Sequence, residues 1–135
     1  MVNGGVGSDR LVAHLHEDGF DDMTGGTSGD SFTFDWYAAP LGDGSKLAVI
    51  HDFSQSDGDK IDLSGLNIKV GGVFADEAFD WIGTAAFRGT AGELRYQQVA
   101  NTWTMIYGDQ DGDASFDVFI QLNGLHTLTA DDFVL

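Results

Sequence analysis

The sequence predicts an all-β protein in which a short parallel β-roll leads into an antiparallel sheet or sandwich. The first observation is a nine-residue pattern of glycine and aspartate that recurs within residues 4–34. The second is the alternation of apolar and polar residues in short segments further along the chain, which is typical of half-buried strands. The third is that no segment has the periodicity of a long amphipathic helix. With 135 residues, 42% of them apolar, the chain is long enough to bury a core.

The nine-residue pattern begins with glycines, has aspartate at its sixth position and an apolar residue at its eighth. Its three imperfect copies are GGVGSDRLV (Gly4–Val12), HEDGFDDMT (His16–Thr24) and GGTSGDSFT (Gly25–Thr33). Glycines let a tight turn expose its carbonyl oxygens, the aspartate adds a carboxylate, and the apolar residue points inward from a short strand. The pattern therefore predicts a parallel β-roll whose turns bind calcium.

Units that lie two apart should stack on the same edge of such a coil, because each unit makes one turn and one strand. Asp9 and Asp30 are two units apart, so we expect them to share an edge and to hold one calcium ion. The backbone carbonyls of Gly5, Gly7 and Gly26 are the expected additional ligands, since calcium takes six to eight oxygens.

A second calcium site is expected on the opposite edge, where the middle unit contributes Asp18, Gly19 and Asp21. This unit is degenerate and no fourth unit follows it, so the site needs ligands from further along the chain. Asp52 and Asp59, each in a turn that flanks a buried strand, are the nearest candidates.

Beyond the repeats, short strands separated by turns are expected up to the C-terminus. The expected strands are Ser31–Trp36, Leu47–Phe53, Lys60–Leu66 (a strand or a helical turn), Leu94–Val99, Thr102–Tyr107, Asp117–Leu122 and Phe133–Leu135. Tyr37–Lys46 is expected to be a loop, Asp76–Phe79 one helical turn, and Leu128–Asp131 a brief turn. We expect the roll to occupy residues 1–34 and the antiparallel part to occupy residues 35–135.

A second acidic loop contains Asp109, Asp111, Asp113 and Asp117 in the pattern D-x-D-G-D-x-x-x-D. Oxygen ligands at this spacing suit a hard cation, although Ala114 stands where such calcium loops place a glycine. The alternative is a solvated hairpin turn, in which the Asp-Gly step supplies the positive φ. Both interpretations remain open at this point.

The charge balance excludes several classes of partner. The 22 acidic residues against 6 basic ones give a net charge of −16, and repulsion on this scale destabilises a compact state unless cations neutralise it. No basic face is available for nucleic acid or an anionic membrane, and no apolar run is long enough to span a bilayer. The lack of cysteine excludes disulfides and thiolate metal sites.

The sequence predicts a noncatalytic chain, because it contains no GxSxG, no HExxH and no cysteine nucleophile. Carboxylates in glycine turns are better explained as calcium ligands than as the acid and base of a glycosidase. The histidines form only a weak zinc pattern; they are His14 and His16 beside Glu17, with His51 and His126 isolated. Several aromatic residues are expected in the core, with an exposed sugar-stacking platform as the alternative; they are Trp36, Tyr37, Trp81, Trp103 and Tyr107.

Four segments, in this order along the chain, resemble the C-terminal domain of serralysin-type secreted metalloproteases and related RTX exoproteins. They are GGTSGDSFTF (Gly25–Phe34), HDFSQSDGDKIDLSGL (His51–Leu66), FRGTAGELRYQ (Phe87–Gln97) and YGDQDGDASFDVFIQLNGLHTLTADDFVL (Tyr107–Leu135). The resemblance implies a calcium-loaded β-roll capped by an antiparallel β-sandwich. It also implies an uncleaved C-terminal signal, ending in Asp131–Leu135, that a type I (ABC transporter) secretion machine reads. The chain departs from the family pattern in its short roll and in lacking the protease domain.

The resemblance and the charge pattern together predict calcium-gated folding: the chain leaves the cell unfolded and folds in extracellular calcium. We expect a noncatalytic module of a larger secreted enzyme, such as a metalloprotease of a Gram-negative bacterium. The start of the chain inside a repeat favours a fragment of a longer protein. The alternatives are a glycan-binding module that binds acidic polysaccharide, or a free-standing secreted calcium-binding structural protein.

Overall fold

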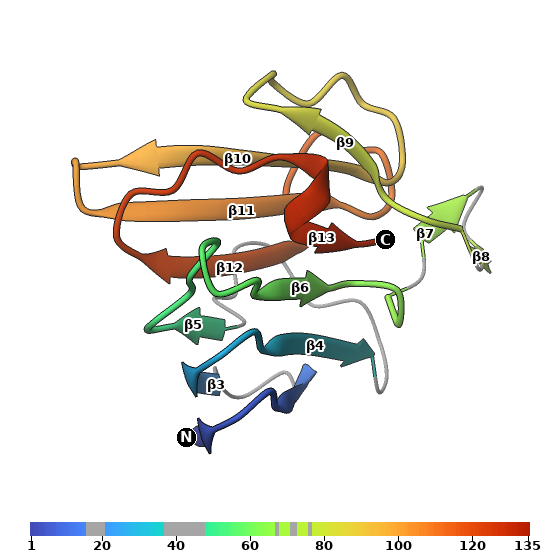
Figure 1. The fold of residues 1–135 in the computed structure, drawn as a ribbon. Coiled ribbons are helices and arrows are strands. Elements are labelled where there is room, and N and C mark those ends of the chain that lie inside the picture. Colours follow the sequence, from blue (N-terminus) through green and yellow to red (C-terminus); the bar gives the residue numbers. More distant parts are fainter. Residues whose placement is uncertain (16–20, 37–47, 67, 71–72, 76) are drawn as a thin grey trace.

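The computed structural model describes residues 1–15, 21–36, 48–66, 68–70, 73–75 and 77–135, and these residues are mostly β (Figure 1). The elements are β1 (Val2–Val6), β2 (Arg10–Leu15), β3 (Asp21–Thr27), β4 (Ser31–Trp36), β5 (Ala48–Ile50), β6 (Lys60–Asp62), β7 (Ile68–Val70), β8 (Val73–Ala75), β9 (Asp80–Gly83), β10 (Glu93–Val99), β11 (Trp103–Asp109), β12 (Val118–Asn123), the 3-10 helix η1 (Ala130–Asp132) and β13 (Phe133–Val134). Two larger sheets face each other, and β7 and β8 form a separate hairpin.

The first six strands wind into a coil that resembles a β-roll, because consecutive strands alternate between two parallel sheets. Strands β1, β3 and β5 pair in parallel in one sheet, and β2, β4 and β6 pair in parallel in the other. One strand from each sheet makes one layer of the coil, so β1–β2, β3–β4 and β5–β6 are three stacked layers. The parallel pairing therefore continues past the recognisable repeats to β6.

The C-terminal strands extend both sheets of the coil. Strand β12 pairs in parallel with β5, and β11 and β10 follow in antiparallel order, with β9 at the far edge. Strand β13 pairs in parallel with β6 in the other sheet. The predicted antiparallel part is present in β10–β12, and it continues one of the coil's sheets. It does so because β5 is buried along its whole length and offers β12 an apolar neighbour.

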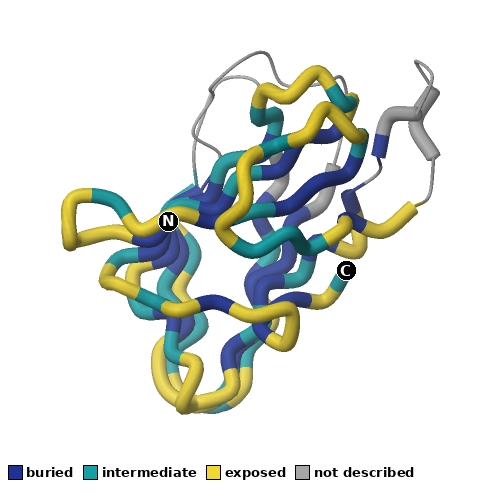
Figure 2. Tube along the Cα trace, turned by 90° about the horizontal axis from the view of Figure 1, so that it is seen from above, coloured by how far each residue is buried: buried dark blue, intermediate teal, exposed yellow. Residues whose placement is uncertain are grey.

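The core lies between the two sheets as one continuous apolar cluster. The apolar residue at the eighth position of each nine-residue unit points into it, and Leu11, Met23 and Phe32 are all buried. Burial of each such side chain contributes about 1.5–3 kcal/mol. In Figure 2 the buried stretches of the chain face one another between the sheets, while the turns at the ends of the strands are exposed. The turns are thus free to carry polar chemistry.

Sequence periodicity located the strands better than it located the connections. Strands β4, β10, β11, β12 and β13 lie within two residues of their predicted positions. Residues 77–79, which belong to the segment expected to form a helical turn, form none and lead into β9. Strand β9 was not predicted because its residues DWIG do not alternate in polarity. The predicted loop Tyr37–Lys46 lies outside the described residues.

The layers approach so closely at one position that only glycine fits there. Gly5 and Gly26 are partners in adjacent layers, and both have a positive φ, of 102° and 106°. A Cβ on Gly26 would overlap the carbonyl oxygen of Gly5. A Cβ on Gly5 would meet no atom within 4 Å. The two glycines therefore share the backbone conformation, and only Gly26 also has a close neighbour.

Replacement of Gly26 with alanine should destabilise the protein more than the same replacement of Gly5. Gly5→Ala should cost about 1–2 kcal/mol, because it places a side chain at a positive φ. Gly26→Ala should cost more than about 3 kcal/mol, because the two layers must also separate. Denaturant unfolding of both variants at the same calcium concentration measures the difference, and equal costs would contradict the close stacking of the layers.

Candidate metal centre

One edge of the coil collects acidic turns from all three layers, and we call residues 5–9, 26–30 and 52–59 the acidic edge. The carboxyl ends of β1, β3 and β5 meet there because parallel strands end at the same side of a sheet. Asp9, Asp30 and Asp59 immediately precede β2, β4 and β6, so they occupy equivalent places in successive layers. The expectation that Asp9 and Asp30 share an edge is confirmed.

Hydrogen bonds connect these aspartates from layer to layer. Asp30 Oδ1 accepts the backbone N–H of Asp9, and Asp59 Oδ1 accepts the backbone N–H of Asp30, both at 2.8 Å. Asp59 Oδ2 accepts the N–H of Ser54, also at 2.8 Å. Asp52 accepts the N–H groups of Gly25 and Gly26 at 2.8 Å each. The aspartates therefore order the glycine turns as well as carrying charge.

Two carboxylate oxygens on this edge have no partner within the described part of the chain. Asp9 Oδ2 and Asp30 Oδ2 are buried and accept no hydrogen bond there, and Asp30 as a whole is only 2% exposed. A Cβ on Gly4 would lie 2.8 Å from Asp9 Oδ2, and a Cβ on Gly25 would overlap Asp30 Oδ2. The glycines thus make room for carboxylate oxygens that accept no hydrogen bond from the described residues, and burial of an unpaired charge is costly. Oxygen ligands in this setting fit a hard cation such as calcium.

Asp52 and Asp59 lie beside Asp9 and Asp30, so the prediction that they complete the Asp21 site is wrong. Asp21 begins β3 and pairs with Ala48 at the start of β5, at the opposite edge of the coil. Asp52 comes after the end of β5 and therefore reaches the acidic edge. Asp18 and Gly19, the other expected ligands of that second site, lie outside the described residues.

The second acidic loop joins β11 to β12 and brings three carboxylates together. Ligand atoms of Asp109, Asp111 and Asp117 all lie within 4.8 Å of one another, so this group could hold a metal ion. Asp113, the fourth predicted ligand, is exposed and accepts the N–H of Ser115 at 2.7 Å. The loop is also a hydrogen-bonded turn, since Asp109 accepts the N–H groups of Gly112 and Ala114 at 2.7 and 2.9 Å. The turn and the cation interpretations are therefore compatible.

Burial raises the pKa of three carboxyls in the two acidic groups. The pKa of Asp117 rises to about 6, because burial and the neighbouring carboxylates outweigh its hydrogen bond from the Gln110 N–H. Burial likewise raises the pKa of Asp109 and of Asp59, against the hydrogen bonds that these carboxylates accept. In the absence of a cation, ionisation of these groups therefore opposes folding.

The described histidines take part in structural contacts. His51 Nε2 lies 2.9 Å from an oxygen of Asp22, and its Nδ1 lies 2.9 Å from the amide of Asn123. His126 contacts the ring of Phe53 and the carbonyl oxygen of Asn123. The side chains of His14 and His16 lie outside the described part, so the weak zinc pattern stays untested there.

The aromatic residues form contacts among themselves. Trp81 stacks on Tyr96, with ring centroids 5.5 Å apart. Tyr107 contacts Phe116 and Phe119. Trp103 is 38% exposed. The side chains of Trp36 and Tyr37 lie outside the described part. A place in the core therefore suits Trp81 better than a place in an exposed sugar-stacking platform.

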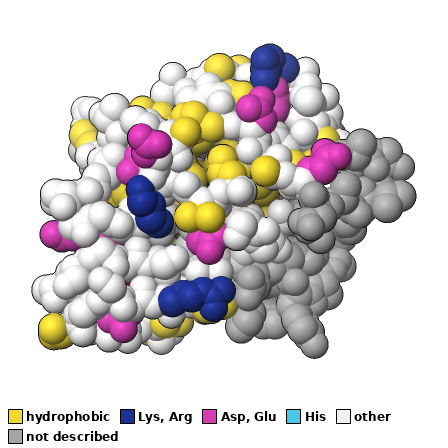
Figure 3. Space-filling model, turned by 45° about the vertical axis from the view of Figure 1, so that its right-hand side comes forward, with side chains coloured by type: hydrophobic (Ala, Val, Ile, Leu, Met, Phe, Trp, Pro, Cys, Tyr) yellow, Lys and Arg dark blue, Asp and Glu magenta, His cyan; other side chains and the backbone are white. Residues whose placement is uncertain are grey.

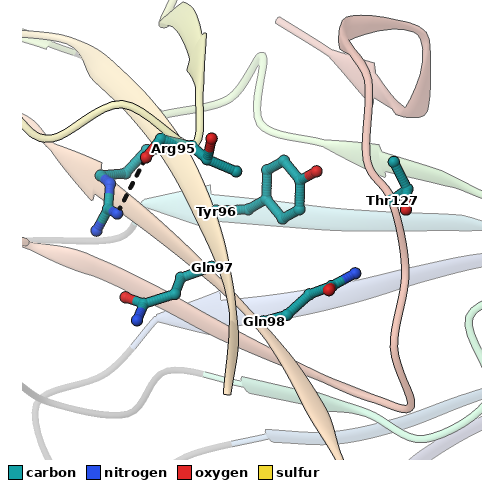
Figure 4. A pocket seen from close by; sticks show the side chains of 6 residues that line it. Arg95, Tyr96, Gln97, Gln98 and Thr127 are labelled. Atoms are coloured by element: carbon teal, nitrogen blue, oxygen red, sulfur yellow. Dashed lines mark hydrogen bonds between the residues drawn. The ribbon is translucent and has the colours of Figure 1, made fainter. Parts of the chain in front are cut away.

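A small polar pocket opens beside β10 (Figure 4). It has a volume of about 190 Å³, and it is lined by Thr84, Arg95, Tyr96, Gln97, Gln98 and Thr127. The Arg95 side chain is already bound, because its Nε donates to the carbonyl oxygen of Ala85 at 2.7 Å. On the face drawn in Figure 3, the lysine and arginine side chains lie apart from one another and form no basic patch.

Comparison with known proteins links the chain to one family. The profile of a family described as peptidase M10 serralysin C terminal matches residues 2–135. No curated protein matches the chain. Among solved structures, the chain is similar to the AlgE6R2 subunit of the Azotobacter vinelandii mannuronan C5-epimerase, solved in solution. The two are 21% identical with a TM-score of 0.42, over 98% of this chain and 85% of that one. No helix among the described residues is long and apolar enough to cross a membrane.

Substitution of Asp117 with asparagine should stabilise the metal-free protein at neutral pH. The folded pKa of about 6 lies above the ordinary value of 3.8, so this carboxyl favours folding below pH 4 and that contribution is lost as the pH rises through 6. The difference between these two pKa values corresponds to at most about 3 kcal/mol of folding free energy. Because Asp117 is partly exposed, solvent screening reduces this figure to ~1 kcal/mol. Asparagine can still accept the Gln110 N–H without carrying charge.

Thermal unfolding between pH 4 and 7.5, in buffers freed of calcium with a chelating resin, measures this effect. We expect Asp117→Asn to unfold a few degrees higher than the wild type at pH 7 and to have a shallower pH dependence. Asp113→Asn, at an exposed position in the same loop, is the matched control and should change the pH profile less than Asp117→Asn does, because Asp113 acts on Asp117 only as a neighbouring charge. Identical pH profiles for Asp117→Asn and the wild type would show that burial of this carboxyl has no effect on stability.

Proposed function

This chain belongs to the peptidase M10 serralysin C-terminal family, and from that premise we propose that it is a calcium-dependent folding and secretion module. Domains of this family are typically noncatalytic parts of secreted metalloproteases and bind calcium. The finer proposal is that extracellular calcium switches on the fold of this chain and that its C-terminus carries a type I secretion signal. The attached enzyme, of which a metalloprotease is the proposed example, supplies the catalysis.

One oxygen each of Asp9 and Asp30, buried without a partner among the described residues, carries this proposal. Each sits in a space that a glycine leaves open, at the edge where the aspartates of three layers stack. Calcium supplies the positive charge that this arrangement lacks. The residues proposed to hold it are Asp9, Asp30 and Asp59 with the carbonyl groups of Gly5, Gly7 and Gly26, and Asp52 orders the turn beside them.

The difference in calcium concentration across the cell envelope sets how much free energy calcium binding adds to folding outside the cell. A site with a dissociation constant on the order of 10⁻⁴ M contributes about 1.4–2.7 kcal/mol at roughly 1–10 mM calcium, and almost nothing at micromolar calcium. Two such sites amount to a large part of the stability of an ordinary small domain. Repulsion among the aspartates keeps the coil open inside the cell, which suits passage through a secretion channel.

The last residues of the folded chain are partly buried, which supports the proposal that the secretion signal is recognised before the chain folds. Phe133 is only 7% exposed, and β13 pairs with β6 at the edge of the four-stranded sheet. Asp132 is buried and accepts the N–H of Thr129 at 2.8 Å. A secretion machine that recognises residues 131–135 would therefore need them unfolded, which is the state that low calcium favours.

The glycan-binding alternative has less support. The pocket of Figure 4 is polar, but its 190 Å³ lies below the roughly 300–1,000 Å³ usual for sites that enclose an organic ligand. A net charge of −16 also opposes acidic polysaccharide unless calcium bridges the two. Retention on an alginate affinity gel in calcium, lost in EGTA, would favour that alternative.

Removal of one charge from the acidic edge should weaken calcium binding without breaking the coil. In Asp30→Asn the amide oxygen can still accept the Asp9 N–H, while the negative charge at the unpartnered oxygen is lost. We expect about tenfold weaker calcium binding and a loss of about half of the rise in melting temperature that calcium gives the wild type. Calorimetric titration and thermal unfolding, each with and without calcium, measure the two effects.

Asp57→Asn is the matched control, because Asp57 is exposed in a turn of the same edge. It removes the same charge from the chain and should leave calcium binding close to that of the wild type. The proposed function fails if excess EGTA leaves the circular dichroism and the melting temperature of the wild type unchanged. Equal losses in Asp30→Asn and Asp57→Asn would instead indicate a general charge effect.

A further inference from the structure

The step from Asn123 to Gly124 connects the end of β12 to the loop that leads toward the C-terminus, and hydrogen bonds hold its main-chain groups on both sides. The Gly124 N–H donates to the carbonyl oxygen of Thr102 at 2.9 Å. The carbonyl oxygen of Asn123 lies 3.0 Å from His126 Nε2. Gly124 has a φ of 90°, a conformation that glycine adopts without strain. The fold therefore fixes this peptide group between the turn that joins β10 to β11 and the loop after β12.

The side chain of Asn123 is held as well. Its Nδ2 donates to His51 Nδ1 at 2.9 Å, and its Oδ1 accepts from Gln121 Nε2 at 3.4 Å. His51 Nε2 in turn lies 2.9 Å from Asp22 Oδ1. Since Asn123 Nδ2 can only donate, His51 accepts at Nδ1 and donates from Nε2 to the carboxylate. The side-chain amide of Asn123 is therefore held by neighbours on its own strand and next to β5.

An asparagine followed by glycine is open to intramolecular deamidation, because glycine has no side chain to shield its nitrogen. The nitrogen of Gly124, after losing its proton to solvent, attacks Asn123 Cγ. The new N–Cγ bond closes a succinimide ring, and Nδ2 leaves as ammonia. Water then breaks one of the two C–N bonds of the ring and gives aspartate or isoaspartate. In the net reaction water is consumed, ammonia is released and the side-chain NH₂ becomes OH.

The folded chain blocks both requirements of this reaction. The attacking nitrogen must lose its proton, but in the fold this N–H is bound to the carbonyl oxygen of Thr102. The side chain of Asn123 must turn toward that nitrogen, but His51 and Gln121 hold it. The reaction therefore has to proceed from states in which this part of the sheet is open, and its rate falls with the population of those states.

We propose that Asn123–Gly124 is a self-modification site, which the folded chain protects and which deamidates, with water as the co-reactant, while the chain remains unfolded. The inference goes beyond the proposed function, because it concerns a covalent change away from the acidic edge. Only its dependence on calcium rests on the proposed function. Its dependence on folding does not.

The position of the site makes its modification damaging to the fold. Strand β12 lies between β5 and β11 in the seven-stranded sheet (Figure 1). Isoaspartate adds a carbon to the main chain and moves the Gly124 N–H away from Thr102. The aspartate product has no N–H group for His51 Nδ1 to accept, and it adds a carboxylate near Asp22. A chain that stays unfolded for long therefore loses part of its ability to fold.

Peptide mapping by mass spectrometry tests the protection. The natural chain is incubated in mildly alkaline buffer with calcium, with EGTA, and with concentrated urea. Conversion of Asn123 should be at least about tenfold slower in calcium than in urea. The other Asn-Gly step of the chain, Asn3–Gly4, is the internal control. The two steps should convert at similar rates in urea, and Asn3, exposed near the start of β1, should be the faster one in calcium.

Refolding provides a second readout. Chains aged in urea are diluted into calcium, and each yield is divided by that of the same chain unfolded freshly. The natural chain should lose yield in step with the conversion of Asn123. The variant Asn123→Gln should keep its yield, because a longer side chain closes the ring far more slowly. The matched control Asn3→Gln should lose yield as the natural chain does.

Two outcomes would overturn the proposal. The first is conversion of Asn123 at the same rate in calcium and in urea. The second is the same loss of refolding yield in Asn123→Gln and Asn3→Gln. Protection of Asn123 that persists in EGTA and disappears in urea would instead uphold the site and count against calcium-dependent folding.

Discussion

Stacking of like charges at one edge of a coil is the constraint on which this structure depends. Asp9, Asp30 and Asp59 occupy equivalent places in three successive layers, and a hydrogen bond connects each of them to the next. Two of their oxygens are buried without partners in the described part of the chain. A cation would offset the repulsion in such an arrangement, and this is the physical basis of the proposed calcium-dependent folding.

The rest of the sequence is consistent with that constraint. Glycines at the acidic edge leave space for carboxylates and for close contact between layers, so they cannot also contribute to a core. The apolar residues are accordingly placed on the strands, where Leu11, Met23 and Phe32 point between the sheets. The coil is short, and its apolar interior continues into the cluster that β10–β12 cover. The antiparallel strands thus enlarge the core that the three layers form between the sheets.

Local periodicity made the Asp9–Asp30 pair predictable, because the nine-residue pattern specifies which turns share an edge. The same reasoning misplaced Asp52 and Asp59, because the pattern stops after Thr33 and gives no count of turns across residues 37–47. Strands β10–β12 were predicted from alternation, whereas their attachment to β5 was not, since strand order depends on contacts distant in sequence. The spacing of Asp109, Asp111 and Asp117 in the sequence suggested that they lie close together. The loop that holds them is both a hydrogen-bonded turn and a group of carboxylates that could bind a cation.

The acidic edge and the C-terminus are physically connected, which links the two parts of the proposed function. The turn that ends in Asp59 also holds the C-terminal segment: Gln55 Nε2 donates to Asp132 Oδ2 at 2.9 Å, and Lys60 Nζ donates to the carbonyl oxygen of Asp131. Strand β6, which follows Asp59 directly, is the strand on which β13 pairs. If repulsion among the aspartates opens this turn, β13 loses both its hydrogen-bonding partner strand and these side-chain contacts. Under the proposed function, the exposure of the last residues is therefore coupled to the charge state of an edge far away in sequence.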